Sequence, residues 1–156
     1  MVTRNSGRFS PELLFTSRGN HSLRFVYGGL EFYEPLTVRQ PLTVWMKTVL
    51  GLQPPDRAIV DESVLLGGTL IDATGSPVRS HTITLSDGDT VLGTVTTDSR
   101  GVFELPVTFR TPGIHTVQAQ FERADFYERS AAQGDIPVFM PTSITCWQPA
   151  KVGHFC

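Results

Sequence analysis

The sequence predicts an all-β protein whose short antiparallel strands pack face to face as a sandwich. Apolar residues alternate with polar ones in stretch after stretch, which is the pattern of a strand with one buried face. Turn-forming segments rich in Gly, Pro and Asp separate these stretches at intervals of about eight to twelve residues. No stretch of helical length carries apolar residues at i, i+3 and i+4. These three observations exclude a helical or α/β architecture.

An internal repeat with a period of 94 residues sets the organisation of the chain. Residues 3–50 align on residues 97–144 without a gap, and twelve of these 48 positions are identical, against roughly three expected for unrelated sequences. The repeat predicts one complete module preceded by the C-terminal half of another. The identities in the first copy are Thr3, Gly7, Phe9, Phe15, Gly19, His21, Phe32, Tyr33, Glu34, Val44, Met46 and Thr48.

The half module, residues 1–50, is expected to contain three strands. The first carries Phe9, Leu13 and Phe15, the second spans residues 23–27, and the third covers residues 42–49. A segment with turn composition, residues 16–20, separates the first two strands. Residues 51–57 follow as a short linker, because two consecutive prolines forbid continuous ladder bonding there.

The complete module, residues 58–145, carries its own set of strands. Alternating apolar residues predict strands over 64–70, 83–85, 91–95, 103–109, 117–121 and 136–140. An Asp-Gly pair at residues 87–88, between two alternating runs, is a strong hairpin signal. Residues 72–77, 98–101 and 111–113 supply the other turns. Residues 146–156 form a C-terminal tail, in which Cys146 and Cys156 either close a disulfide in an oxidising compartment or remain free thiols.

The complete module resembles the bacterial and archaeal immunoglobulin-like repeat domains over residues 60–138, and the half module does so over residues 7–44. The resemblance implies an immunoglobulin-like β-sandwich. Arg123 and Ala124 replace the Gly-Asp pair usual at the corner loop, and Leu36 and Thr37 replace the corner Ser of the first copy. A weaker resemblance, to carboxypeptidase-regulatory-like sandwiches, ends before His115. The matching residues are Gly93, Gly101, Pro112, Gly113, His115, Ala119, Phe121, Tyr127, Ser130 and Ala132.

Composition narrows the possible functions. Charged residues make up 18% of the chain, the net charge is −2 and basic residues are scattered, so we expect no nucleic-acid partner. No apolar run reaches 18 residues, so no membrane insertion is expected. The N-terminus shows no secretory signal pattern.

No set of residues indicates catalysis or a cofactor, and we expect no enzymatic activity. The sequence lacks a G-x-S-x-G motif, and His21 and His115 have no evident catalytic partners, which favours structural roles for both. A calcium ion would be incompletely coordinated by Asp87 and Asp89, even with Asp72 or Asp98 added. We therefore interpret these residues as turn residues and expect no metal site. The sequence identifies no ligand-binding residue.

The family resemblance implies a structural or adhesive module of a larger extracellular or cell-surface protein, acting as a spacer or an interaction module. Two alternatives stay open: an accessory module of an extracellular enzyme, and a subunit that assembles by strand exchange. Expected partners are other modules of the same or a neighbouring chain, with any protein or glycan ligand unknown. Because residues 1–50 would leave an apolar face uncovered, we expect self-association through them.

Overall fold

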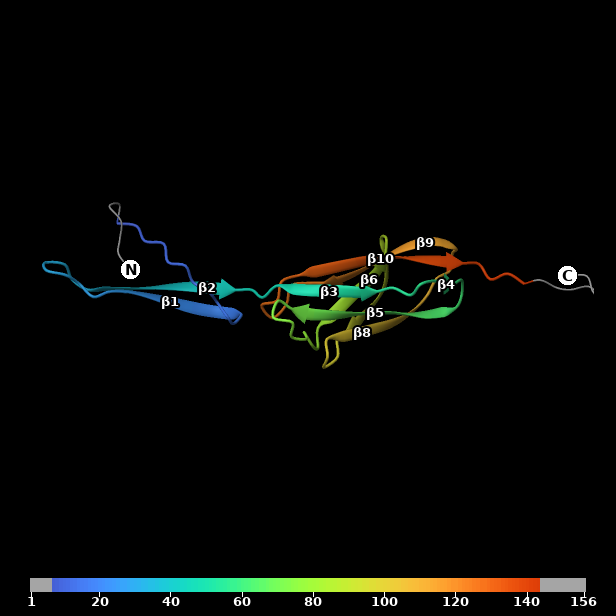
Figure 1. Ribbon diagram of the computed structural model, residues 1–156, viewed down its shortest axis with the longest axis horizontal. Helices are drawn as coiled ribbons and strands as arrows, with labels where there is room; N and C mark the ends of the chain where they lie inside the picture. Colours follow the sequence, from blue (N-terminus) through green and yellow to red (C-terminus); the bar gives the residue numbers. More distant parts are fainter. Residues whose placement is uncertain (1–6, 144–156) are drawn as a thin grey trace, which may run out of the picture.

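The computed structural model describes residues 7–143 and contains ten strands. Eight of them form a two-layer sandwich, and the other two form a separate hairpin that extends from one end of it (Figure 1). Cys146, Cys156 and the predicted tail lie outside the described residues. The ten strands are β1 (Gly19–Tyr27), β2 (Leu36–Val44), β3 (Thr48–Gln53), β4 (Ala58–Ile59), β5 (Ser63–Asp72), β6 (Thr82–Asp87), β7 (Thr90–Thr96), β8 (Val102–Thr108), β9 (Gly113–Phe121) and β10 (Ser130–Phe139).

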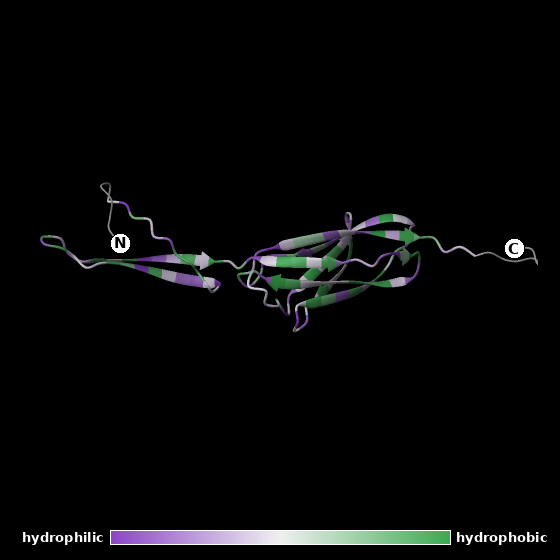
Figure 2. Cartoon of the chain, viewed as in Figure 1, coloured by the Kyte–Doolittle hydropathy of each residue, from purple (hydrophilic) through white to green (hydrophobic). Residues whose placement is uncertain are grey.

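The sandwich packs a five-stranded sheet, in the order β4-β10-β9-β6-β7, against a three-stranded sheet, in the order β3-β5-β8. Every pairing is antiparallel except the short one between β4 and β10. The alternating residues of the sequence point inward and are almost fully buried, and Figure 2 shows the apolar stretches along the sandwich strands. The all-β immunoglobulin-like sandwich is therefore confirmed. The largest fully buried side chains are Phe103, Leu66, Leu70, Ile83, Leu85, Ile136, Val78 and Val117.

The hairpin of β1 and β2 reproduces the geometry of β9 and β10 at the repeat distance of 94 residues. Gly19 pairs with Val44 in the first copy, as Gly113 pairs with Val138 in the second, and the register is the same along both hairpins. The corner residue takes a left-handed conformation in both copies, with φ of 68° at Phe32 and 63° at Phe126. The internal repeat is thus a repeat of structure as well as of sequence.

The predicted strand over residues 9–15 is wrong. Residues 8–14 correspond to β8, which in the complete module bonds to β5. Within the described residues the first copy has no counterpart of β5, and a single extended segment without a neighbour cannot satisfy its backbone groups in a ladder. Residues 8–16 therefore lie extended beside the hairpin without joining a sheet (Figure 1).

The boundary between the half module and the complete module also differs from the prediction. Residues 48–53 were assigned partly to the half module and partly to the linker 51–57, but they form β3 and pair with β5 from Thr48 to Gln53. Leu50 is buried in the sandwich core. The sandwich therefore begins at Thr48, ten residues before the predicted start at Ala58, because β5 offers β3 a complete antiparallel partner. The prolines interrupt the chain only after β3, at residues 54–55.

Candidate functional site

The two repeats meet at a junction where the hairpin joins the sandwich. Only residues 45–47 separate β2 from β3. The backbone of Met46 is held on both sides by the corner loop between β9 and β10, since its N–H donates to the Phe126 carbonyl at 2.7 Å and its carbonyl accepts from Glu128 N–H at 2.8 Å. Ala73 N–H donates to the carbonyl of Lys47 at 2.9 Å. A three-residue connection tied in this way is a clamped joint.

Aromatic and cationic side chains surround that joint. The guanidinium carbon of Arg18 lies 4.0 Å from the centre of the Tyr127 ring, and its Nε donates to the Asp125 carbonyl at 3.0 Å. The rings of Trp45 and Phe126 are 5.6 Å apart between centroids. A cation over an aromatic face contributes about 0.5–1 kcal/mol where water has access. Arg18 therefore fastens the turn before β1 to the corner loop of the next module.

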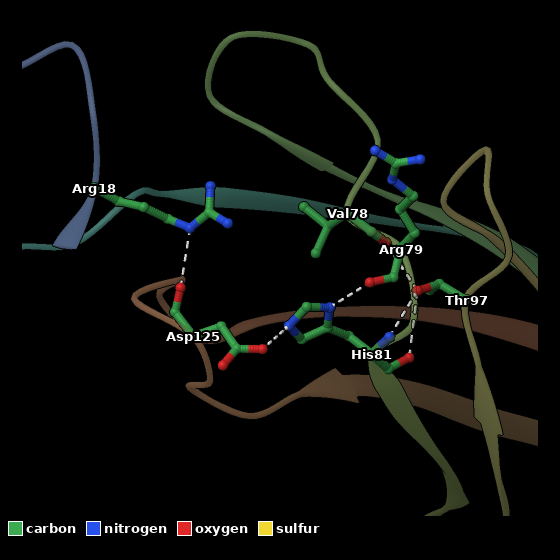
Figure 3. Close-up of polar contacts among 6 residues, drawn as sticks. All are labelled: Arg18, Val78, Arg79, His81, Thr97 and Asp125. Carbon is green, nitrogen blue, oxygen red and sulfur yellow. Dashed lines mark hydrogen bonds and ion pairs between the residues drawn. The ribbon is translucent and has the colours of Figure 1, made fainter.

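His81 supports the corner loop from the sandwich side (Figure 3). Its Nε2 lies 2.9 Å from a carboxylate oxygen of Asp125, and its Nδ1 lies 2.6 Å from the Arg79 carbonyl. The ring also packs edge-on against Phe121 and Tyr127. Asp125 thus links two parts of the chain, with its carboxylate on His81 and its backbone carbonyl on Arg18.

Thr97 fixes the backbone from which His81 projects. The threonine is buried, its hydroxyl donates to the Val78 carbonyl at 2.8 Å, and the same oxygen accepts from His81 N–H at 3.1 Å. The contacts in Figure 3 therefore run without a break from the buried Thr97 to Arg18 at the joint. Since the sandwich core immobilises one end of this series, the corner loop presents a pre-formed surface to the half module.

An open recess of about 650 Å³ lies beside the junction, and Asp72 contributes to its wall. Burial alone would raise the pKa of Asp72, but hydrogen bonds from the Thr74 hydroxyl, from Thr74 N–H and from Ser76 N–H, together with the Arg18 charge, hold that pKa below its ordinary value. These bonds engage one carboxylate oxygen within its own turn. The residues lining the recess are Thr16, Ser17, Arg18, Gly19, Met46, Asp72, Thr74, Asp125 and Phe126.

The acidic residues considered for calcium are distributed over separate turns. Asp98 accepts hydrogen bonds from Arg100 N–H and Val102 N–H, while Asp89 is exposed at the β6–β7 turn. Asp87 lies 2.5 Å from Nδ1 of His115. Within residues 7–143, no three His, Cys, Asp or Glu side chains are grouped as metal ligands.

His115 and His21 occupy equivalent positions but differ in their partners. Nε2 of each ring faces a backbone carbonyl four residues earlier, at 2.8 Å on Thr111 and 3.0 Å on Ser17. The hydrogen bond to Asp87 raises the pKa of His115, with smaller contributions that raise it from the Thr111 carbonyl and the Asp87 charge, against an opposing effect of burial. The sequence did not indicate Asp87 as the partner, because the two residues lie 28 positions apart.

Sequence reasoning also missed Arg18. A signal was present, because Arg18 aligns with Pro112 in the repeat. A charged residue that replaces a turn proline in one copy of a repeat points to a contact that only that copy makes. Trp45 aligns with Phe139, so the aromatic character of its position was visible, but its contact with Phe126 was not.

Comparisons with known proteins agree with this architecture. A family model described as bacterial Ig-like domain (group 3) matches residues 52–137, more than half of the chain, and no curated protein matches the sequence. The solution structure of a CARDB domain from Pyrococcus furiosus is 16% identical with a TM-score of 0.50, and the match covers 62% of this chain and 97% of that chain. A crystal structure of the same domain in complex with di-metal ions is 14% identical with a TM-score of 0.47, covering 64% and 99% of the two chains. At 16% identity, the likeness to the solution structure shows the fold alone.

Proposed function

The chain belongs to the family of bacterial Ig-like domains (group 3), and from this membership we propose that it is a spacer segment of a larger extracellular or cell-surface protein. In this role, successive modules are joined end to end and hold a distal part of the protein at a set distance and orientation. The spacer bears mechanical load, maintains the relative orientation of the parts it connects and performs no catalytic step. Adhesion by exposed loops would be an added property of the same array.

The observation that carries this proposal is the clamped joint between the two repeats. A flexible tether would connect modules through a run of unbonded residues. Here the connection at residues 45–47 makes backbone hydrogen bonds to the corner loop and to the turn after β5. Thr48 adds side-chain bonds to the Glu128 carbonyl at 2.8 Å and to the Ser130 hydroxyl at 2.7 Å. The Thr48 bonds fix the end of the connection in the sandwich, and the contacts of Arg18 with Asp125 and Tyr127 resist bending between the hairpin and the sandwich.

The arrangement of the chain fits an extended array. The hairpin and the sandwich lie end to end along the longest axis, and β10 leads out of the sandwich at the end opposite to the hairpin (Figure 1). Stacked modules that contact only their neighbours give reach in proportion to their number. No helix in residues 7–143 has the length and apolar character needed to cross a membrane.

Small-angle X-ray scattering of the full chain tests the rigid joint. The wild-type protein should fit a single elongated conformation, and a double variant Arg18→Ala with Trp45→Ala should require a broader set of orientations. Arg24→Ala, on the exposed outer face of the hairpin, is the matched control and should leave the scattering unchanged. Equal flexibility of all three proteins would contradict the spacer proposal.

Location is tested separately, on intact cells that express the protein in its natural context. Added protease or an impermeant amine-reactive label should reach the module without lysis. A module that is modified only after lysis would contradict an extracellular or surface location.

A further inference from the structure

The β1–β2 hairpin has an open inner face and a free strand edge that its structural copy does not have. In the sandwich, β9 bonds to β10 on one side and to β6 on the other, whereas β1 bonds only to β2 within residues 7–143. Phe121 and Ile136 are 2% and 0% exposed, but their counterparts Tyr27 and Leu42 are 47% and 37% exposed. An uncovered apolar face beside an unpaired edge is a template for another strand.

The inner face of the hairpin is also more apolar than that of its copy. Leu36 and Val38 stand where the complete module has Ser130 and Ala132. Residues 8–16 cover this face in part, with the rings of Phe9 and Phe25 5.5 Å apart. An apolar hollow of about 510 Å³ remains, large enough to admit several side chains. It is lined by Phe9, Arg24, Phe25, Val26, Tyr27, Leu36 and Val38.

The register of β6 on β9 shows what would fit the free edge. Ile83 pairs with Phe121, Leu85 with Ala119 and Asp87 with Val117. Shifted by the repeat distance of 94, these positions become Tyr27, Phe25 and Leu23 on β1. A strand bound there in the same register places apolar residues opposite Tyr27 and Phe25 and an acidic residue opposite Leu23.

His21 supplies an independent reason for the acidic position. In the complete module, His115 binds the Thr111 carbonyl through Nε2 and Asp87 through Nδ1. His21 makes the first contact, to the Ser17 carbonyl, but no carboxylate within the described part of the chain lies at its Nδ1. In the described part of the chain, β1 therefore lacks both things that β6 gives to β9: a strand that bonds to its edge, and a carboxylate for its histidine.

We propose that the free edge of β1 and the inner face of the hairpin bind an antiparallel strand of the β6 type, supplied by the N-terminal half of an Ig-like module. This strand carries two apolar residues, two positions apart, followed two positions later by an Asp or Glu that binds Nδ1 of His21. Main-chain bonding to Leu23–Tyr27 gives the affinity, and the apolar pair with the acid gives the specificity, as in other cases of strand addition. The inference rests on the repeat geometry and is independent of the spacer role.

A synthetic hairpin peptide with the sequence of residues 80–98, which spans β6 and β7, tests the proposal on the full chain. Fluorescence anisotropy should show saturable binding, and hydrogen exchange should show new protection of the β1 amides that point away from β2. An Asp87→Asn peptide should bind about tenfold more weakly, as expected for loss of one charge-assisted hydrogen bond. The β9 edge cannot account for the binding, because native β6 occupies it.

Two protein variants complete the test. With His21→Gln, the Asp and Asn peptides should bind equally, since the group that distinguishes them is gone. Ser22→Ala, at an exposed position of β1 outside the hollow, should bind both as the wild type does. Failure of the peptide to bind, or binding without protection of β1, would overturn the proposal. So would a full chain whose hairpin is already closed by a second copy that the peptide cannot displace.

Discussion

Phe103 and Phe9 are identical residues at matched positions of the repeat, and the structure predicts very different consequences of truncating them. Phe103 is 1% exposed in the sandwich core, while Phe9 is 46% exposed on the hairpin. The ring of Phe103 also lies over Gly68, where the chain leaves no room for any side chain. Phe103→Ala therefore removes a fully buried ring from the sandwich core.

The expected magnitudes follow from burial. Phe103→Ala should lower the free energy of unfolding by about 3–5 kcal/mol, the usual cost for a buried Phe. For a sandwich of roughly 100 residues this corresponds to a fall in Tm of at least about 12 °C. Phe9 packs on Phe25 outside the sandwich, so Phe9→Ala should remove only that contact, worth about 0.5–1.5 kcal/mol. This loss should not appear in the main unfolding transition.

Urea unfolding of the full chain, followed by far-ultraviolet circular dichroism, compares the effects of the two variants on the main transition. Phe103→Ala should lower the midpoint without changing the dependence on urea, which indicates an unchanged unfolded surface. Equal losses for the two variants would refute the reasoning, because they would mean that Phe9 is enclosed in a core as complete as that of Phe103. A loss below about 1 kcal/mol for Phe103→Ala would contradict its packing.

Three further predictions concern the sandwich. The pKa of His115 is raised above its value in the unfolded chain, so its contribution to stability is complete below about pH 6.5 and is lost as the pH rises through the folded pKa. His115→Gln should flatten this part of a curve of Tm against pH. An unchanged curve would mean that another group causes the pH dependence. Gly68→Ala should prevent folding or lower Tm severely, because its Cβ would lie 2.0 Å from the Gly51 carbonyl oxygen, and a normal melt would show that β3 and β5 separate easily. A fragment of residues 58–143 should have a lower Tm than a fragment of residues 46–143, because the shorter one lacks β3 and the buried Leu50. Burial of that leucine is worth about 1.5–3 kcal/mol. Equal Tm values would mean that the domain begins at Ala58.

The amino-acid pattern determined the sandwich and the equivalence of the two hairpins. Alternation of apolar and polar residues directs one face of each strand inward, so Leu66, Leu70, Ile83 and Leu85 could be assigned to the core directly. The repeat carried the same information for β1 and β2, since two segments with the same turn and corner residues fold to the same register. These features are local, and local periodicity is what a sequence displays.

Tertiary structure decided the features that depend on distant partners. Residues 9–15 alternate as a strand should, yet they form none, because a strand needs a neighbour and residues 7–143 hold no second counterpart of β5. Residues 48–53 belong to the sandwich because β5 is available to pair with them. Asp87 meets His115, and Arg18 meets Tyr127, across 28 and 109 positions of the chain. Such contacts depend on how strands are ordered in space, and the spacing of residues along one chain does not contain that order.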